Sequence, residues 1–339
     1  MAIGVLTAGG DCPGLNAAIR AVVTRVTAEG EAVVGIENGW DGLMSGTTRP
    51  LTRDDVRGIL VRGGTILGTS RRDPYVHGEG YESVRAAIEA NAIESLVVIG
   101  GDGSLRTAVQ LQDGGLRIVG VPKTIDNDIA GTDVSFGFHT AVQIVTDALD
   151  RLTTTAESHN RVMVVEVMGR TAGWIAAYAG LAGGAEIVLV PEVRYDLDEV
   201  AARLNRRHAA GHDYSVVVVA EGTPGPAGDV SSRGVDAFGF DRIGGIGQYV
   251  SSELERLTGF ESRLTTLGYL QRGGTPNAFD RVLATRMGLA AAELALEGAS
   301  GVMVGVRGDE IVPVDLGEAC GEPRLLDERR FAEAAWFFA

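Results

Sequence analysis

The stretch "IGVLTAGGDCPGLNAAIRAVVTRVTAEG", residues 3–30, holds the three parts of a parallel-sheet unit in a row. A short apolar run leads through a glycine-rich loop into a segment with the helical period. The order recurs when "SLVVIG" leads through "GDGS" into "LRTAVQLQDGG", and further apolar runs follow as "RIVGVP", "RVMVVEVMG", "EIVLVPE" and "SVVVVAEG". Near-continuous apolar strands that alternate with helices predict mainly parallel sheets covered on both faces, so the fold class is α/β.

The composition is that of a soluble globular chain. Its 339 residues are 45% hydrophobic and 22% charged, and the length favours two domains or lobes. The net charge of −15 argues against a nucleic-acid-binding surface, which needs a basic face. The sequence shows no signal peptide, no window suited to a bilayer, and no metal spacing for its two cysteines, Cys12 and Cys320. We therefore expect a cytoplasmic protein without nucleic-acid or membrane partners.

One later segment departs from the strand and helix rhythm. The stretch "GTPGPAGDVSSRGVDAFGFDRIGG", from Gly222, has no hydrophobic period and predicts an exposed loop. The tail "DERRFAEAAWFFA" predicts an amphipathic helix whose aromatic residues serve for docking.

Three glycine-rich loops follow predicted strands and are candidates for binding phosphate. In "TAGGDCPGLNAAIR", backbone N–H groups and the helix dipole would form an anion site, although a plain tight turn fits about as well. In "VVIGGDGSL", Asp102 beside a phosphate implies Mg²⁺, and the alternative is a helix N-cap. In "GGTILGTSRRDPY", Arg71 and Arg72 form either a phosphate clamp or a solvated pair. All three loops lie at strand ends, where parallel sheets bind ligands, and this placement favours function.

The stretch "PKTIDNDI" gathers Lys123, Thr124, Asp126 and Asp128 within six residues. Phosphoryl transfer to an alcohol needs a base for the hydroxyl proton, cations for the phosphates and in-line positioning. Asp126 can be the base, Asp128 a carboxylate on the metal side, and Thr124 a hydroxyl donor to the phosphoryl group. Together with the glycine loops, this stretch predicts a kinase site.

These motifs resemble those of the 6-phosphofructokinases of the bacterial A type over essentially the whole chain. The motifs that carry the resemblance are "GVLTAGGDCPGLNAAIR", "GGDGS", "PKTIDNDI", "RVMVVEVMGR", "VAEG" and "GYLQRGGTP", in the family's order. The resemblance implies two similar three-layer α/β/α lobes with mainly parallel sheets. Residues 1–138 and 271–322 would form the nucleotide-binding lobe, and residues 139–270 and 323–339 the lobe that binds fructose 6-phosphate. The implied activity is the glycolytic phosphorylation of fructose 6-phosphate to fructose 1,6-bisphosphate, with ATP as co-substrate and Mg²⁺ as cofactor.

The resemblance also assigns roles to single residues. Asp126 would be the base for the fructose 1-hydroxyl, Asp102 and Asp128 would lie on the metal side, and the catalytic set would further include Thr124, Gly10 and Arg170. The nucleotide would contact Gly10, Arg71, Arg72, Gly101, Asp102, Gly103 and Ser104. The sugar phosphate would contact Thr124, Ile125, Asp126, Arg161, Met168, Gly169, Arg170, Glu221, Arg263, Tyr269, Leu270, Gln271 and Arg272.

In the family, the positions of Arg161 and Arg263 reach the 6-phosphate from a neighbouring subunit. The resemblance therefore implies a homotetramer or homodimer with shared active sites. Tyr269 stands where many members have histidine, and a tyrosine cannot become cationic near neutral pH. Arg20, Arg53 and Glu186 match the family's effector cluster, but its other cations are replaced by Thr24, Thr153 and His212, which predicts no strong activation by ADP.

Two positions bear on the phosphoryl donor. Pyrophosphate-dependent members typically carry aspartate where this chain has Gly103, and glycine leaves space for the α-phosphate of ATP. The same members typically carry lysine at the position of Lys123. A side chain that excludes the α-phosphate by size and charge is harder to overcome than the lack of a helpful cation. We therefore predict ATP as the donor, with pyrophosphate as the alternative. An NAD or lipid kinase shares "GGDG" but lacks the other motifs, and a catalytically silent regulatory subunit would have lost Asp126 or an acceptor arginine.

Overall fold

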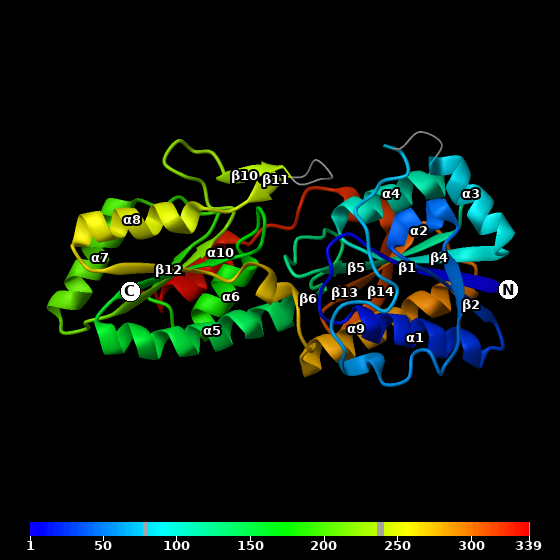
Figure 1. The fold of residues 1–339 in the computed structure, drawn as a ribbon, viewed down its shortest axis with the longest axis horizontal. Helices are drawn as coiled ribbons and strands as arrows, with labels where there is room; N and C mark the ends of the chain where they lie inside the picture. Colours follow the sequence, from blue (N-terminus) through cyan, green and yellow to red (C-terminus); the bar gives the residue numbers. More distant parts are fainter. Residues whose placement is uncertain (77–79, 236–240, 339) are drawn as a thin grey trace. The chain divides into compact units, whose positions relative to one another are not determined.

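The computed structural model describes residues 1–76, 80–235 and 241–338 of the chain, drawn as a ribbon in Figure 1. The chain forms two compact units. Unit 1 consists of Met1–Ile125, Ile129–Thr140 and Arg272–Pro323, and unit 2 of Asp126–Asp128, Ala141–Gln271 and Arg324–Ala339. The sequence analysis placed the crossings after residues 138, 270 and 322, and it did not anticipate that Asp126–Asp128 belong with unit 2.

Unit 1 is built on a twisted, mainly parallel sheet in the order β14-β13-β5-β4-β1-β2-β3, with β6 paired to β5. The strands β3 and β14 at the two edges run antiparallel to their neighbours, and the other pairs are parallel. The strands are β1 (Ala2–Ala8), β2 (Ala32–Ile36), β3 (Thr48–Leu51), β4 (Ile93–Gly100), β5 (Ile118–Thr124), β6 (Phe136–Gly137), β13 (Val302–Arg307) and β14 (Glu310–Asp315).

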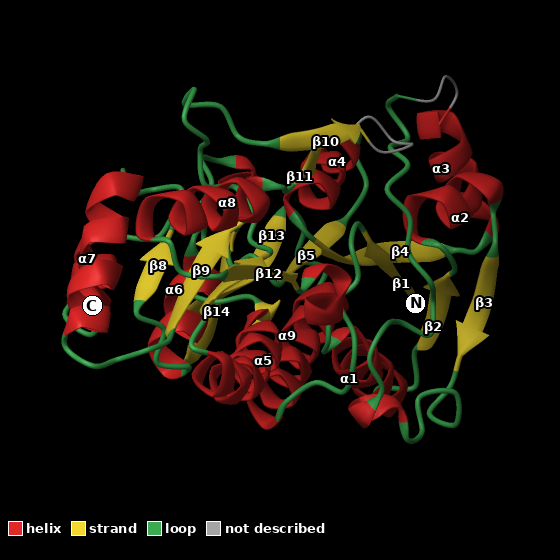
Figure 2. Ribbon diagram, turned by 60° about the vertical axis from the view of Figure 1, so that its left-hand side comes forward, coloured by secondary structure: helices red, strands yellow, loops and turns green. Residues whose placement is uncertain are grey.

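Helices cover both faces of this sheet (Figures 1 and 2). On one face α1 (Leu15–Ala28) packs against α9 (Ala278–Leu296), and on the other lie α2 (Gly39–Ser45), α3 (Gly80–Ala90) and α4 (Asp102–Asp113). Short 3₁₀ turns, η1 (Ile59–Val61) and η3 (Leu316–Cys320), complete the unit. The central strands are apolar on both faces because both are buried. This confirms the predicted three-layer α/β class.

Unit 2 contains a smaller parallel sheet in the order β12-β7-β9-β8. Its strands are β7 (Val162–Val167), β8 (Ile187–Leu189), β9 (Ser215–Ala220) and β12 (Ser262–Thr266). The helices α7 (Leu197–Ala209) and α8 (Ile246–Thr258) share an apolar core with one face. The other face is covered by α6 (Trp174–Ala182), on which α10 (Glu328–Ala335) packs, and Figure 1 shows α5 (Phe138–His159) on the same side. The 3₁₀ turn η2 (Gly268–Arg272) lies where the stretch Ala141–Gln271 of unit 2 ends.

The segment after Gly222 is more ordered than the expected loop. It contains an antiparallel ribbon of β10 (Ser232–Val235) and β11 (Asp241–Ile243), preceded by a bridge between Pro224 and Val230. Residues 236–240 of that segment lie outside the described residues. A two-stranded ribbon has few apolar residues to alternate, which is why the hydrophobic pattern did not reveal it.

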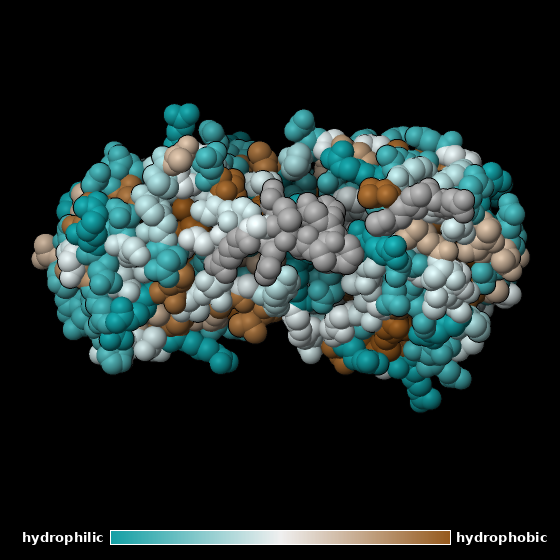
Figure 3. Space-filling view, turned by 45° about the horizontal axis from the view of Figure 1, so that its top comes forward, coloured by the Kyte–Doolittle hydropathy of each residue, from teal (hydrophilic) through white to brown (hydrophobic). Residues whose placement is uncertain are grey.

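Polar residues dominate the face of the molecule that Figure 3 draws. Figure 3 shows a face that is largely hydrophilic, with hydrophobic residues scattered in small areas. After the predicted terminal helix, Trp336 is 88% and Phe337 76% exposed. Among the described helices, none combines the length and hydrophobicity that crossing a bilayer requires.

Candidate active site

The strand register of unit 1 brings the predicted donor loops to one edge of the sheet. Ala8 at the end of β1 pairs with Gly100 at the end of β4, and Gly100 pairs with Pro122 in β5. The residues that follow these strand ends are therefore neighbours at the carboxyl edge, where ligands bind in open α/β sheets. Gly9 and Gly101 are the first residues after β1 and β4, and Lys123 is the next-to-last residue of β5.

The first loop is fastened to the segment that carries the paired arginines. The Gly9 amide donates to the Ser70 carbonyl at 2.9 Å, and the Thr69 hydroxyl donates to the Gly9 carbonyl at 2.7 Å. Gly9 adopts φ 83°, a conformation that favours glycine. Arg71 and Arg72 follow directly, and Arg72 pairs with Asp41 at 2.6 Å. The prediction that the arginine loop follows a strand is wrong, because the segment comes after the 3₁₀ turn η1 (Ile59–Val61), and its hydrogen bonds to Gly9 place it beside the first loop.

The second loop begins α4 without a side-chain cap. Gly101 is the N-cap residue, so the alternative of Asp102 as the cap is wrong, and Asp102 is the first residue of the helix. Its carboxylate accepts from Arg106 Nε at 2.9 Å and is 40% exposed. A Cβ placed on Gly103 would meet no atom of the described structure within 4 Å. The first turn of α4 thus has open space at Gly103, and the first N–H groups of a helix have no partner within the helix itself.

Lys123 lies under the first loop rather than in solvent. It is 3% exposed, and Nζ donates to the Gly10 carbonyl at 2.5 Å. Arg272 approaches the same loop, since Nη1 donates to the Asp11 carbonyl at 3.2 Å and would lie 2.8 Å from a Cβ on Gly10. The sequence analysis assigned Arg272 to the sugar 6-phosphate, but in this structure its guanidinium lies on the glycine loop of unit 1. Two cations therefore face the backbone that would bind an anion.

Asp102 is chemically suited to a magnesium ion that is held mainly by phosphate. Mg²⁺ usually takes one or two carboxylates together with waters and substrate phosphates. Among the described residues, no group of three or more His, Cys, Asp or Glu side chains could hold a metal by itself. An exposed ion pair such as that between Asp102 and Arg106 is weak, so the carboxylate is available to a ligand. Asp128, the other predicted carboxylate, belongs to unit 2.

The stretch with the proposed base leaves β5 and joins unit 2 for three residues. Asp126 is 4% exposed and Asn127 also 4% exposed. Asn127 has φ 56°, in the left-handed region that asparagine tolerates better than most residues. Thr124 and Ile125, which precede it, remain buried in unit 1, where the Thr124 carbonyl accepts from Ser135 Oγ at 2.9 Å.

In unit 2 the acceptor motifs also meet at a carboxyl edge. Val167 at the end of β7 pairs with Ala220 in β9, which brings Met168 next to Glu221. The Arg170 amide donates to Glu221 Oε1 at 3.1 Å, and the Arg170 side chain is exposed. Arg170 has φ 52° and Gly169 φ 142°, so this triplet makes a sharp loop.

Three residues of the motif "GYLQR" differ strongly in exposure. Tyr269 is 77% and Leu270 67% exposed, whereas Gln271 is fully buried. Gln271 Oε1 accepts from the Met168 amide at 3.2 Å, and Nε2 donates to the Gly268 carbonyl at 3.1 Å. In this structure Gln271 supports the acceptor loop from within, and its side chain does not face solvent as a direct sugar contact would require.

Arg161 and Arg263 lie at the opposite edge of the unit 2 sheet. Arg161 precedes β7 and Arg263 is near the start of β12, and both pair with the carboxylate of Glu261. Hydrogen bonding from Arg161, with a smaller contribution from Arg263, lowers the pKa of Glu261. A strand rises about 3.3 Å per residue, so β7 separates Arg161 from Met168 by roughly 20 Å. Within one chain these arginines cannot share a ligand with the Met168–Arg170 loop.

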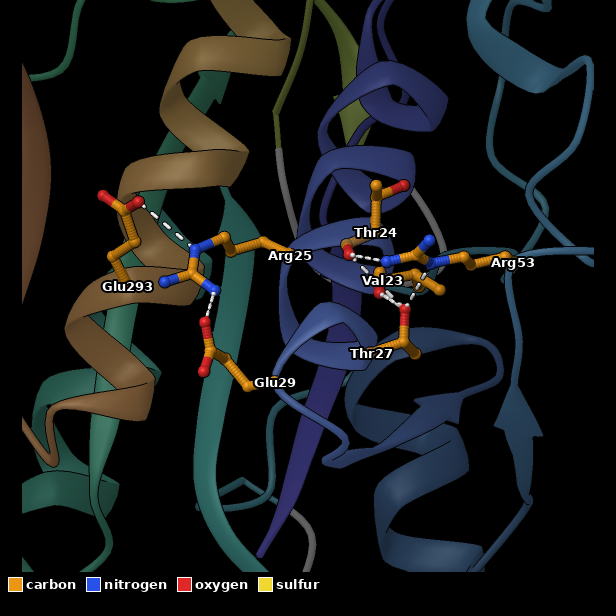
Figure 4. A network of polar contacts seen from close by, with 7 residues as sticks. All are labelled: Val23, Thr24, Arg25, Thr27, Glu29, Arg53 and Glu293. Atoms are coloured by element: carbon orange, nitrogen blue, oxygen red, sulfur yellow. Dashed lines mark hydrogen bonds and ion pairs between the residues drawn. The ribbon is translucent and has the colours of Figure 1, made fainter.

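Two residues of the predicted effector cluster, Arg53 and Glu186, make contacts within their own units, and Figure 4 shows those of Arg53. Arg53 Nε donates to Thr27 Oγ1 at 3.1 Å, and Nη2 donates to the Thr24 carbonyl at 3.3 Å, both on α1. In unit 2, Glu186 pairs with Arg207 at 2.6 Å and accepts from the Val216 amide at 2.6 Å. The absence of ADP activation stays a prediction.

Comparison with known proteins identifies the family. The family model described as phosphofructokinase matches residues 2–295. The chain belongs to the phosphofructokinase family. It is 52% identical to a pyrophosphate–fructose 6-phosphate 1-phosphotransferase of Amycolatopsis methanolica, over 100% of both chains. It is 51% identical to ATP-dependent 6-phosphofructokinase 3 of Streptomyces coelicolor, over 98% of this chain and 99% of the relative.

The fold agrees with solved phosphofructokinases. A structure of phosphofructokinase from Saccharomyces cerevisiae superposes with a TM-score of 0.84 at 33% identity, and the match covers 94% of this chain and 45% of that one. The phosphofructokinase family therefore accounts for the architecture and for the order of the motifs. The names of the two relatives differ in the donor, which overall identity does not decide.

One arginine that the sequence analysis did not single out contacts the proposed base segment. Arg324 donates to two carbonyls of Asp126–Asp128, and its guanidinium lies over Trp174. Arg324 is 197 residues from Asn127 in sequence, and neither residue lies in a helix or strand. No period or motif in the sequence could have revealed the contact.

Proposed function

We propose that this phosphofructokinase transfers the γ-phosphoryl group of ATP to the 1-hydroxyl of D-fructose 6-phosphate. The observation that carries the choice of donor is the open space at Gly103, in the first turn of α4. A nucleotide places a third phosphate and a nucleoside beyond the two phosphates that pyrophosphate has. The loop that would contact them presents no side chain at this position.

The chain's own groups account for the chemistry of the donor. The Gly10 amide and the first turn of α4 bind phosphate oxygens, and Lys123 and Arg272 hold the loop through hydrogen bonds to the carbonyls of Gly10 and Asp11. Arg71 and Arg72 add positive charge beside the nucleotide. A magnesium ion bound at Asp102 would neutralise charge on the phosphates, and Asp128 belongs to the same proposed set.

The acceptor is activated and oriented by residues of unit 2. Asp126 accepts the proton of the 1-hydroxyl as the sugar oxygen bonds to the γ-phosphorus and the bond from phosphorus to the β-γ bridging oxygen breaks. ADP leaves with that electron pair. Met168, Gly169, Arg170 and Glu221 bind the sugar, while Thr124 and Gly10 contact the transferred group. Low exposure of Asp126 supports a role away from bulk water.

The shared active site of an oligomer is part of the proposal. Arg161 and Arg263 lie at the edge of the sheet remote from the acceptor loop, and their positions are those that the family takes from a neighbouring subunit. Two copies related by symmetry would bring one copy's Arg161 to the other's acceptor loop. A homodimer or homotetramer with shared sites satisfies this geometry. We likewise propose that the protein is cytoplasmic.

A coupled assay tests the donor directly. Purified protein is given fructose 6-phosphate and Mg²⁺ with either ATP or pyrophosphate, and fructose 1,6-bisphosphate is measured. We expect product with ATP and at least 100-fold less with pyrophosphate. Product with pyrophosphate alone would replace the proposal by the pyrophosphate-dependent reaction, which Lys123 and the similarity to the Amycolatopsis relative favour.

A further inference from the structure

Arg324, the first residue of the last stretch of unit 2, holds the segment that carries the proposed base. Its backbone N–H donates to the Asp128 carbonyl at 2.8 Å, and its Nη1 donates to the Asn127 carbonyl at 3.0 Å. The two carbonyls that follow Asp126 most closely along the segment are thus both fixed by one residue. The guanidinium makes one of these hydrogen bonds and the backbone N–H makes the other.

The other side of Arg324 is fixed by a buried tryptophan. Its Cζ lies 4.1 Å from the centroid of the Trp174 ring, a cation–π distance, and Trp174 Nε1 donates to the Arg324 carbonyl at 2.9 Å. Trp174 is 2% exposed and is the first residue of α6. The loop that carries Met168–Arg170 leads directly into this helix.

A carboxylate completes the connection. Glu192 Oε1 accepts from the Gly173 amide and from the Leu326 amide, each at 2.9 Å. Glu192 thus joins the start of α6 to the chain just after Arg324. We call Arg324, Trp174 and Glu192 the Arg324 clasp. It ties the base segment on one side to the end of the acceptor loop on the other.

The base segment depends on such contacts for its position. Residues 125–129 form neither helix nor strand, so no ladder of backbone hydrogen bonds fixes them. Asn127 has a positive φ, a conformation that persists only where the surroundings determine it. Arg324 fixes this conformation through its hydrogen bonds to the carbonyls of Asn127 and Asp128.

We propose that Arg324 is a positioning residue for the general base Asp126, and that the clasp sets the base relative to the bound acceptor. This inference rests on the proposed function. The guanidinium contacts the backbone after Asp126 and not the substrate, so its contribution is to geometry in the transition state. A misplacement of about 1 Å at a reacting group can lower the rate by about 100-fold.

The first test is a comparison of kcat and KM in matched variants. Arg324→Met keeps the aliphatic stem and the backbone N–H but removes the bond to Asn127 and the cation–π contact. We expect kcat to fall about 10- to 100-fold while KM for each substrate stays within about twofold. Arg324→Lys keeps the charge and should recover part of kcat. Trp174 fluorescence should change in Arg324→Met, which reports loss of the stacked guanidinium.

Arg330→Met is the matched control. Arg330 also lies over the Trp174 ring, at 5.7 Å, but among the described residues it has no hydrogen bond to the base segment. Its removal should change the fluorescence and leave kcat unchanged. If Arg330→Met lowered kcat as much as Arg324→Met, packing around Trp174 rather than the held carbonyls would be responsible, and the inference would be overturned.

The second test asks whether Arg324 acts through Asp126. In the Asp126→Ala background, adding Arg324→Met should change the residual kcat by less than about twofold, because the positioned group is already gone. An equal loss in both backgrounds would overturn the proposal, as would an unaffected kcat in Arg324→Met. The unsubstituted protein is assayed first with both donors. An active parent with an unaffected variant therefore refutes only the role of Arg324, whereas an inactive parent refutes the proposed function.

Discussion

Gly103 offers the sharpest test of how the donor is chosen, through the substitution Gly103→Asp. The glycine is the second residue of α4, and an added Cβ would meet nothing within 4 Å in the described structure. Its backbone is helical and does not adopt a left-handed φ, so the position accepts an L side chain. Replacing a helical glycine stabilises by up to about 1 kcal/mol, and an acidic residue suits the first turn of a helix. The variant should therefore fold with an unchanged or slightly raised Tm.

We expect the substitution to lower kcat/KM for ATP. We take about 5 Å as the separation between the new carboxylate and a nucleotide phosphate bound at the first turn of α4. Two unit charges at that distance repel by about 3 kcal/mol at an effective dielectric constant of about 20. Each 1.36 kcal/mol is a factor of ten, so kcat/KM for ATP should fall by about 100-fold. The assay is the coupled measurement of fructose 1,6-bisphosphate at saturating fructose 6-phosphate.

Gly103→Ala separates size from charge. It adds the same Cβ without the carboxylate, and we expect kcat/KM for ATP within about fivefold of the parent. A Gly103→Asp variant that kept the parent's kcat/KM for ATP, with an unchanged Tm, would refute the reasoning. It would mean that the nucleotide phosphates do not pass the first turn of α4. An equal loss in both variants would assign the effect to size alone.

Three further predictions concern the acceptor loop, a buried carboxylate and the shared site. Gly222→Ala would place Cβ 1.7 Å from the Arg170 carbonyl oxygen, so we expect a loss of about 1–3 kcal/mol in unfolding free energy and a lower kcat, measured by urea unfolding and assay. Burial raises the pKa of Asp280, so the folded state holds this proton more tightly than the unfolded state and stability falls as pH rises above about 4; Asp280→Asn should flatten that decline in unfolding measured from pH 4 to 7. Mixing inactive Asp126→Ala and Arg161→Ala subunits through a dissociation and reassembly step should restore roughly a quarter of the activity, because half the sites of each hybrid dimer carry neither change.

Controls and contrary outcomes differ among these three. Gly225→Ala, whose Cβ would meet its nearest atom at an ordinary 3.6 Å, should be nearly neutral, and equal destabilisation of both variants would contradict the close-contact argument. For Asp280, an identical pH dependence in the parent and the variant would remove this carboxyl as its source. For the mixture, activity no higher than the sum of the separate variants would show that each site is built from a single chain.

The donor loops could be predicted from the sequence because parallel register makes their meeting place a local property. Ala8 and Gly100 end neighbouring strands, Pro122 pairs with Gly100 near the end of β5, and each strand is recognisable as an apolar run. Whatever follows such ends must gather at one edge of the sheet. The same logic brought Met168 and Glu221 together in unit 2. The hydrophobic pattern therefore predicts which site residues lie at the ends of strands.

What the pattern could not place are the groups held by contacts between irregular segments. The departure of Asp126–Asp128 from unit 1 depends on hydrogen bonds to Arg324, far away in sequence and outside any helix or strand. Burial of Gln271 depends on the Met168 amide that it binds, and a glutamine in a polar motif gives no sign of that. Such contacts depend on three-dimensional packing, which residue spacing does not report.

The arginines at the two ends of the unit 2 sheet link the affinity for fructose 6-phosphate to the assembly of subunits. A single chain presents Arg170 and Glu221 at the carboxyl edge, and Arg161 and Arg263 at the amino edge, where both bind Glu261. A dianionic phosphate near the carboxyl edge would find neither of the latter arginines in its own chain. A neighbour that supplies them must release them from Glu261, which is a competing anion already in place. Binding of the sugar phosphate and rearrangement of the Glu261 pair are then coupled steps, so the affinity for fructose 6-phosphate should depend on how the subunits meet as well as on the acceptor loop itself.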